Sequence, residues 1–194
     1  MRPTLFSLLF ALGLFVLGHD AGAQQTINIV SSIDSQTLTG TLYRPEGEGP
    51  FPAVVILHDC SGLGPRSSGA PGRWARELVR QGYVVLTPDS FSSRGFDSGV
   101  CTVPGNQQRN VRGIVRASDA YAALAALREL PFVQGDRVGL MGGSHGGSAT
   151  LATLVAARSA SEPLAAQKAK GFAAGVALYP GCLAAYGEWS TRQA

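Results

Sequence analysis

The sequence predicts a single α/β domain built on a mostly parallel β-sheet with helices on both faces. Short apolar runs, typical of strands buried on both faces, alternate with segments of helical periodicity. The 194 residues are 45% hydrophobic and 15% charged, which is enough apolar material for one core and too much for a disordered chain. The 25 glycines and 11 prolines follow no repeating period and therefore indicate turns.

The elements follow from these patterns in chain order. Alternating side chains over 26–33 and 38–43 predict an antiparallel hairpin. Continuous apolar runs predict buried strands over 53–57, 83–86, 137–141 and 171–179. Helical spacing predicts helices over 73–80, 110–130 and 148–157.

The N-terminus has the pattern of a secretory signal peptide. Arg2 precedes an apolar run over 5–17, and Ala21-Gly22-Ala23 supplies the small residues that signal peptidase accepts. An uncleaved anchor is the alternative, but the run is shorter than the roughly 20 residues that a membrane-spanning helix needs. We therefore expect residues 1–23 to be removed and residues 24–194 to form a periplasmic or secreted domain that is not bound to the membrane.

Composition excludes several partners and cofactors. The formal net charge is +3, and no run of five or more like charges appears, so nucleic-acid binding is not expected. Export would allow two of Cys60, Cys101 and Cys182 to form a disulfide and leave one free, although spacing does not identify the pair. Burial as small apolar side chains is the alternative. No Cys/His spacing indicates zinc, and we expect no metal and no organic cofactor.

A nucleophile motif lies between a predicted strand and a predicted helix. Gly142-Gly143-Ser144-His145-Gly146 fits the pattern G-x-S-x-G in the strand–turn–helix setting that gives this pattern its meaning. Side chains at Gly142 or Gly146 would clash with neighbouring backbone in such a turn. We expect Ser144 to present its hydroxyl as the nucleophile and the amide of His145 to stabilise a developing oxyanion.

Two other interpretations of this turn are weaker. Ser144 could simply cap the helix, but a cap does not need four surrounding glycines. A phosphate-binding loop would need G-x-x-x-x-G-K or G-x-G-x-x-G, and neither occurs at this turn.

The segment after the strand at 53–57 supplies the expected second oxyanion donor. Hydrolases of this architecture place that amide after the equivalent strand, so the amide of Asp59 or Cys60 is our candidate. A buried histidine at a strand end is usually a hydrogen-bonded core residue, which is the preferred role for His58. Asp89, after the next strand, is expected to anchor its loop.

These segments together resemble the dienelactone hydrolase family of α/β-hydrolases from about residue 26 to residue 179. The resemblance rests on the hairpin, His58-Asp59, Pro88-Asp89-Ser90-Phe91 with Arg94-Gly95, and the turn over 142–147. It implies hydrolysis of esters or lactones by a nucleophile at the turn, usually Cys, with an Asp and a His later in the chain. Because Ser144 replaces that Cys, a general esterase is the better expectation. The resemblance also implies that Arg94 could contact a substrate carboxylate.

The expected acid and base do not follow Ser144. The three histidines are His19, His58 and His145, and the ring of His145 should diverge from the adjacent serine hydroxyl. Two further strand–helix units of about thirty residues each would be needed, whereas only 181–194 follow the last predicted strand and Pro180. We expect a C-terminally truncated α/β-hydrolase, nearly inactive as this chain; a natural non-catalytic derivative is the alternative.

The predicted function is therefore that of an exported serine hydrolase for small carboxylic esters or lactones, acting through an acyl-enzyme at Ser144. A small-ligand-binding module that keeps the fold without chemistry is the alternative from another class. A subunit that completes its sheet with a partner is a third possibility. Neither the substrate nor the oligomeric state follows from the sequence.

Overall fold

The computed structural model describes residues 23–155 and 171–181. Nearly all of the predicted signal peptide, the end of the last predicted helix, and Cys182 lie outside these ranges. Within the described part of the chain, no helix has the length and apolar character needed to cross a membrane.

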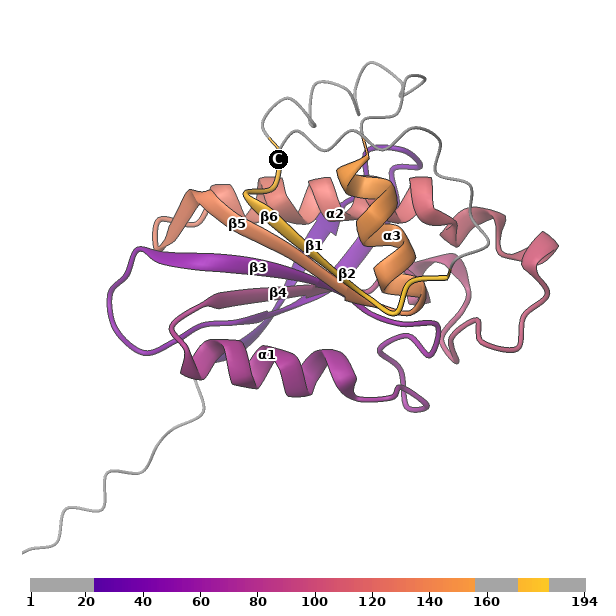
Figure 1. Ribbon diagram of the computed structural model, residues 1–194, viewed down its shortest axis with the longest axis horizontal. Helices are drawn as coiled ribbons and strands as arrows, with labels where there is room; N and C mark the ends of the chain where they lie inside the picture. The colour runs from indigo at the N-terminus through magenta and orange to yellow at the C-terminus, as the bar shows by residue number, and fades with distance from the viewer. Residues whose placement is uncertain (1–22, 156–170, 182–194) are drawn as a thin grey trace, which may run out of the picture.

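Within the described residues, six strands form one twisted sheet in the order β1-β2-β4-β3-β5-β6 (Figure 1). β1 pairs antiparallel with β2 and β2 with β4, whereas β4, β3, β5 and β6 run parallel to one another. The predicted antiparallel hairpin therefore joins the edge of a parallel sheet. The strands are β1 (Gln24–Val30), β2 (Thr37–Tyr43), β3 (Phe51–Leu57), β4 (Val84–Pro88), β5 (Val133–Gly143) and β6 (Ala174–Leu178).

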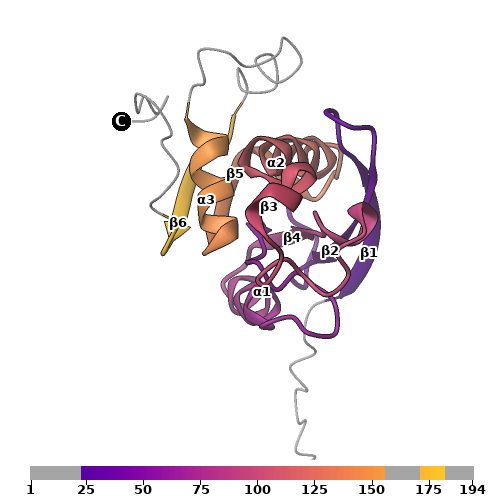
Figure 2. The ribbon, with the colours of Figure 1, turned by 90° about the vertical axis from the view of Figure 1, so that its right-hand side faces the viewer.

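In the part of the chain that the structure describes, helices α1, α2 and α3 cover the two faces of the sheet (Figure 2). α1 (Ala70–Arg80) packs on one face against β4, while α2 (Gly113–Arg128) and α3 (His145–Leu154) lie together on the other. Short 3-10 turns occur at Ser92–Arg94, Gly105–Gln107 and Arg109–Val111. The prediction of an α/β fold with helices on both faces is confirmed.

The larger core lies between the sheet and α2. α2 buries residues on nearly every side because it packs against both the sheet and α3, and its many alanines permit this close approach. The smaller core beneath α1 joins Ala75 to Ile56 and Val85. The side chains of the larger core include Leu38, Val55, Leu86, Leu124, Leu127 and Leu140.

All three helix starts differ from the prediction. α2 begins at Gly113, three residues late, because a 3-10 turn occupies Arg109–Val111 before it. α1 begins at Ala70, three residues early, because Pro71 occupies its first turn, where the missing N–H costs no hydrogen bond. α3 begins at His145, also three residues early, although glycines at 146 and 147 disfavour a helix. Packing of these glycines against the sheet outweighs that intrinsic preference.

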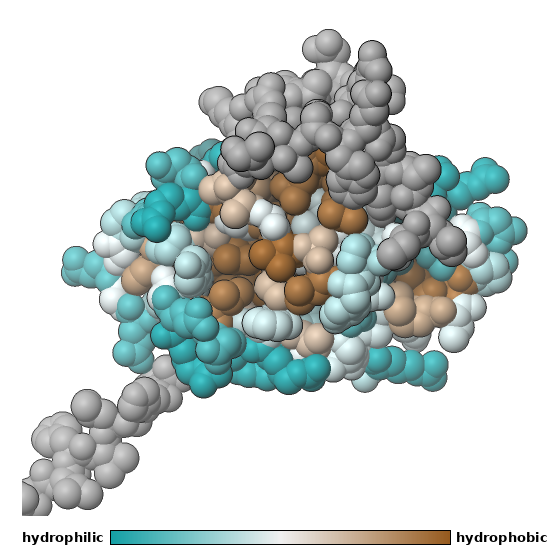
Figure 3. All heavy atoms as spheres, in the orientation of Figure 1, coloured by the Kyte–Doolittle hydropathy of each residue, from teal (hydrophilic) through white to brown (hydrophobic). Residues whose placement is uncertain are grey.

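An apolar surface extends over β3, β5 and β6 above α1 (Figure 3). Val54, Leu140 and Val176 line a hollow there, and Val176 is 50% exposed. α3 covers β6 on the opposite face only.

A disulfide joins Cys60 to Cys101, which resolves the pairing that spacing left open. The bond closes a loop of 41 residues and lies beside a small cluster of Phe91, Val100 and Val111. A crosslink of this span stabilises a folded domain by about 2–4 kcal/mol in the loop-entropy description.

α3 approaches the end of β3 most closely at Gly146. A Cβ atom there would lie 2.1 Å from the carbonyl oxygen of Leu57 and 2.6 Å from that of His58. A Cβ at Gly142 would lie 2.3 Å from the Gly146 carbonyl oxygen. All three obstacles are backbone atoms, so no side-chain rotation relieves the overlap.

We therefore predict that Gly146→Ala destabilises the domain by at least about 2 kcal/mol, because the methyl group must push α3 away from β3. Gly105→Ala is the matched control, since no heavy atom lies within 4 Å of its Cβ position. Urea unfolding followed by circular dichroism measures both. Equal stability of the two variants would contradict the close approach.

Candidate active site

Ser144 occupies the single residue between β5 and α3. Its backbone has φ 54° and ψ −118°, a conformation that costs a non-glycine residue on the order of 1–3 kcal/mol. Its amide donates to the carbonyl of Leu178 at 3.0 Å, and its own carbonyl accepts from the amide of Ser148 at 2.9 Å. These bonds hold the turn at both ends.

The Ser144 side chain makes no capping hydrogen bond to α3. A serine present only as an N-cap would accept a hydrogen bond from an amide in the first turn through its hydroxyl. The geometry therefore argues against the cap interpretation and leaves the hydroxyl available for other chemistry.

The two segments that carry the predicted oxyanion donors, Asp59–Cys60 after β3 and His145 after β5, meet at one edge of the sheet. We call them the oxyanion segments. β3 and β5 are neighbouring parallel strands in which Leu57 pairs with Gly142. Asp59 therefore lies two residues beyond Leu57, just as Ser144 lies two residues beyond Gly142. The amide of His145 also stands at the start of α3, where helix amides lack partners within the helix and favour negative charge.

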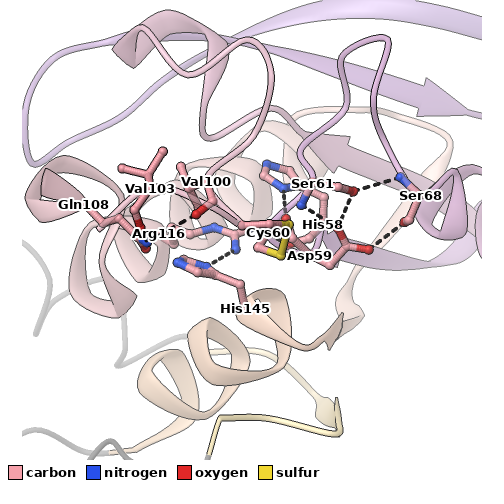
Figure 4. The surroundings of a disulfide bond; sticks show 11 residues. His58, Asp59, Cys60, Ser61, Ser68, Val100, Val103, Gln108, Arg116 and His145 are labelled. Atoms are coloured by element: carbon pink, nitrogen blue, oxygen red, sulfur yellow. Dashed lines mark hydrogen bonds between the residues drawn. A yellow bond between two sulfur atoms is a disulfide. The ribbon is translucent and has the colours of Figure 1, made fainter. Parts of the chain in front are cut away.

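Hydrogen bonds fix the Asp59 loop. The Asp59 carboxylate accepts from the amide and hydroxyl of Ser61 and from the hydroxyl of Ser68. Although burial opposes this effect, these bonds hold the pKa of Asp59 below its usual value. The Val100 amide donates to the Cys60 carbonyl at 2.6 Å, and the disulfide adds a covalent link to the same loop (Figure 4).

His58 is fully buried, and both of its ring nitrogens are engaged. The amide of Ser90 donates to Nε2 at 3.2 Å, so the proton belongs on Nδ1, which lies 2.9 Å from the carbonyl oxygen of Asp59. Burial and the nearby Arg116 lower the pKa of His58 to about 3. Asp89 Oδ1 lies 4.0 Å from Nε2, but a neutral imidazole forms no ion pair with it. His58 is thus a neutral core residue.

His145 also lacks a free basic nitrogen. Its Nδ1 accepts a hydrogen bond from Arg116 at 2.7 Å, which places the proton of the neutral ring on Nε2. Burial and the cation of Arg116 lower the pKa of His145 to about 4. Neither histidine that the structure describes is therefore available to accept a proton from Ser144 near neutral pH.

The expected contact between Arg94 and a substrate carboxylate is not supported by this geometry. Its side chain is 2% exposed and forms two hydrogen bonds of 2.8 Å to the carboxylate of Asp119. Its remaining donors reach Asp34 and the carbonyl of Ser90. Against the effect of burial, the two carboxylates raise the pKa of Arg94 above its usual value. Arg94 joins the hairpin turn to α2.

Asp89 anchors the loop after β4. Its carboxylate accepts from the amides of Phe91 and Ser92 and from the Ser92 hydroxyl. Although burial opposes this effect, these bonds hold the pKa of Asp89 below its usual value.

Sequence reasoning did not identify Arg116, which is 0% exposed beside both oxyanion segments. Its guanidinium donates to His145 and to the carbonyl of His58. A signal was present, because Arg116 is a charged residue in register with Ala120 and Leu127 on the apolar stripe of its helix.

The described residues bring together no group of three His, Cys, Asp or Glu side chains that could hold a metal ion. The arrangement instead offers a serine hydroxyl in a strained turn with backbone amides beside it. These are the components of nucleophilic acyl transfer.

Comparison with known proteins places this arrangement among hydrolases. Over 134 residues the chain is 31% identical to dipeptidyl aminopeptidase BIII of Pseudoxanthomonas mexicana. This match covers 64% of this chain and 19% of that protein. The dipeptidyl peptidase 4 structure of Porphyromonas gingivalis matches 82% of this chain and 21% of its own, with 21% identity and a TM-score of 0.57. The chain therefore spans about a fifth of the length of either peptidase.

The esterase Pf2001 of Pyrococcus furiosus has the same fold over 82% of this chain and 52% of its own, with 18% identity and a TM-score of 0.56. Structural likenesses at such low identity establish the α/β-hydrolase fold alone. The sequence profile of one family, described as the dienelactone hydrolase family, matches residues 38–181, which is most of the chain. The chain belongs to the dienelactone hydrolase family.

Proposed function

We propose that this protein is an exported serine hydrolase that cleaves small carboxylic esters or lactones through an acyl-enzyme at Ser144. The observation that carries the proposal is the backbone of Ser144, held at φ 54° between β5 and α3 without a capping bond from its side chain. A residue that only links a strand to a helix gains nothing from such backbone strain. A nucleophile does, because the strained turn presents its hydroxyl to the substrate.

The proposed reaction follows from the neighbouring groups. The Ser144 oxygen attacks the substrate carbonyl carbon, and the carbonyl oxygen becomes an oxyanion that accepts hydrogen bonds from the amides of His145 and of Asp59 or Cys60. Collapse of this intermediate expels the alcohol and leaves the acyl group on Ser144, from which water then releases the acid. Removing one such oxyanion donor typically slows acyl transfer by about 10²–10³-fold.

The proton of Ser144 needs a base that the described residues do not provide. Nδ1 of His145 is bound to Arg116, and His58 is buried with both nitrogens engaged. We propose that a histidine and a carboxylate from protein outside the described residues complete the triad, and that this chain alone turns over esters slowly.

A fluorophosphonate probe tests the nucleophile. On prolonged incubation with excess probe, the chain should gain one phosphonyl group at Ser144, and Ser144→Ala should abolish that label. Ser148→Ala is the matched control, because this serine lies one turn further along α3 and should not affect labelling. Peptide mass spectrometry locates the label.

A label that survives Ser144→Ala would overturn the acyl-enzyme mechanism. No labelling at all, together with a rise in melting temperature on adding small ligands, would favour a binding module instead.

The pH dependence of labelling tests whether His58 or His145 acts as the base. Because the pKa values of His58 and His145 are lowered to about 3 and about 4, both rings are already deprotonated above about pH 5. The labelling rate should therefore show no inflection between about pH 5.5 and about pH 8. A sigmoidal step near pH 6.5, the ordinary pKa of histidine, would show that an imidazole does act as base. Hydrolysis of the probe without protein provides the baseline.

A further inference from the structure

Arg116 bridges the two segments that carry the candidate oxyanion donors. It projects from α2, and its Nη2 donates to the carbonyl oxygen of His58 at 2.8 Å. Its Nη1 donates to Nδ1 of His145 at 2.7 Å. Figure 4 shows the guanidinium lying between His145 and the His58–Cys60 segment.

The bond to His58 acts on the adjacent amide. The carbonyl of His58 and the N–H of Asp59 belong to one planar trans peptide, in which the two groups point in opposite directions. By binding that carbonyl, Arg116 fixes the direction of the Asp59 N–H. A charged donor on the carbonyl also polarises the peptide and strengthens its N–H as a donor.

Burying the charge of Arg116 at this position costs free energy, and its surroundings offset little of that cost. Asp119, one turn further along α2, gives its carboxylate to Arg94, and among the described residues no carboxylate forms an ion pair with Arg116. Its Nε has no hydrogen-bond partner within that part of the chain. The Phe91 ring, 5.1 Å from the guanidinium carbon, offers partial compensation.

The guanidinium nevertheless remains charged at neutral pH. Burial lowers the pKa of Arg116 only to about 10. An apolar side chain of similar volume is often neutral or stabilising where a buried ion is replaced. Stability alone therefore does not explain this arginine.

We propose that Arg116 is a positioning residue that sets the oxyanion hole, aligning the amide of Asp59 on one side with the amide of His145 on the other. The inference rests on the proposed function, because aligned amides stabilise an oxyanion only if acyl transfer occurs at Ser144. It also favours Asp59 over Cys60 as the second donor, because Arg116 holds the peptide that contains the Asp59 N–H.

The experiment compares Arg116→Met, which keeps much of the side-chain volume and removes the charge, with Arg128→Met. Arg128 is the matched control because it lies on the same helix and also makes two hydrogen bonds, in its case to the backbone carbonyls of Gly135 and Gly171. Arg116→Lys retains the cation with a single donor group and provides the test should the methionine variant fail to fold.

The first measurement is the second-order rate of fluorophosphonate labelling at Ser144, in which the phosphonyl oxygen occupies the oxyanion hole. Arg116→Met should slow labelling by about tenfold to a hundredfold, because small displacements of positioned donors cost rates of that order. Arg116→Lys should fall between the wild type and Arg116→Met, and Arg128→Met should label at the wild-type rate. Equal labelling rates for the Arg116 and Arg128 variants would overturn the inference.

The second measurement is made by nuclear magnetic resonance and does not depend on any reaction at Ser144. Arg116→Met should shift the amide resonances of Asp59 and His145 together and raise the pKa of the His145 ring toward its ordinary value, and Arg128→Met should do neither. Failure of the wild type to label at Ser144 would overturn the proposed function, and the resonances would still decide the role of Arg116. Unchanged resonances in both Arg116 variants would refute it.

Discussion

The contact between the first turn of α3 and the last carbonyls of β3 sets the geometry on which the site depends. Gly146 lies so close to Leu57 and His58 that only a hydrogen atom fits between the two backbones. That approach lets the turn from β5 into α3 close within one residue, and Ser144 absorbs the resulting strain. Ser144 and the Asp59 loop are neighbours because two parallel strands end together and a helix crosses directly over them.

Two buried arginines near this contact differ in the charge of their hydrogen-bond partners. Arg94 is neutralised by Asp34 and Asp119 and fastens the hairpin to α2. Arg116 is bound by a carbonyl and an imidazole, both uncharged acceptors, and keeps its positive charge next to the turn. Because the Asp119 carboxylate is bound to Arg94, Arg116 has no ion-paired carboxylate among the described residues. The ion pairs of Arg94 stabilise the fold, whereas Arg116 changes the electrostatics of the site.

The features that depend on local pattern could be predicted from sequence. The buried strands, the hairpin and the serine turn follow from side-chain alternation, apolar runs and glycine spacing, all of which act within a few residues. The start of α3 and the roles of Arg94 and Arg116 depend on partners distant in the chain. Arg94 finds Asp34 and Asp119 only when the hairpin and α2 come together. The same holds for the disulfide, because Cys60 and Cys101 meet through the loop between them.

The central position of β3 has a consequence for the order in which the protein can fold. β3 pairs with β4 soon after synthesis, but its other edge waits for β5, where Val54 pairs with Gly139. Pairings so distant in sequence form slowly because they require a long loop to close first. While a nascent chain awaits β5, one side of an apolar strand stays unpaired and prone to association. The pairing of β3 with β5, which brings Ser144 to the Asp59 loop, is thus also a late step in folding, so the candidate site assembles only when the sheet does.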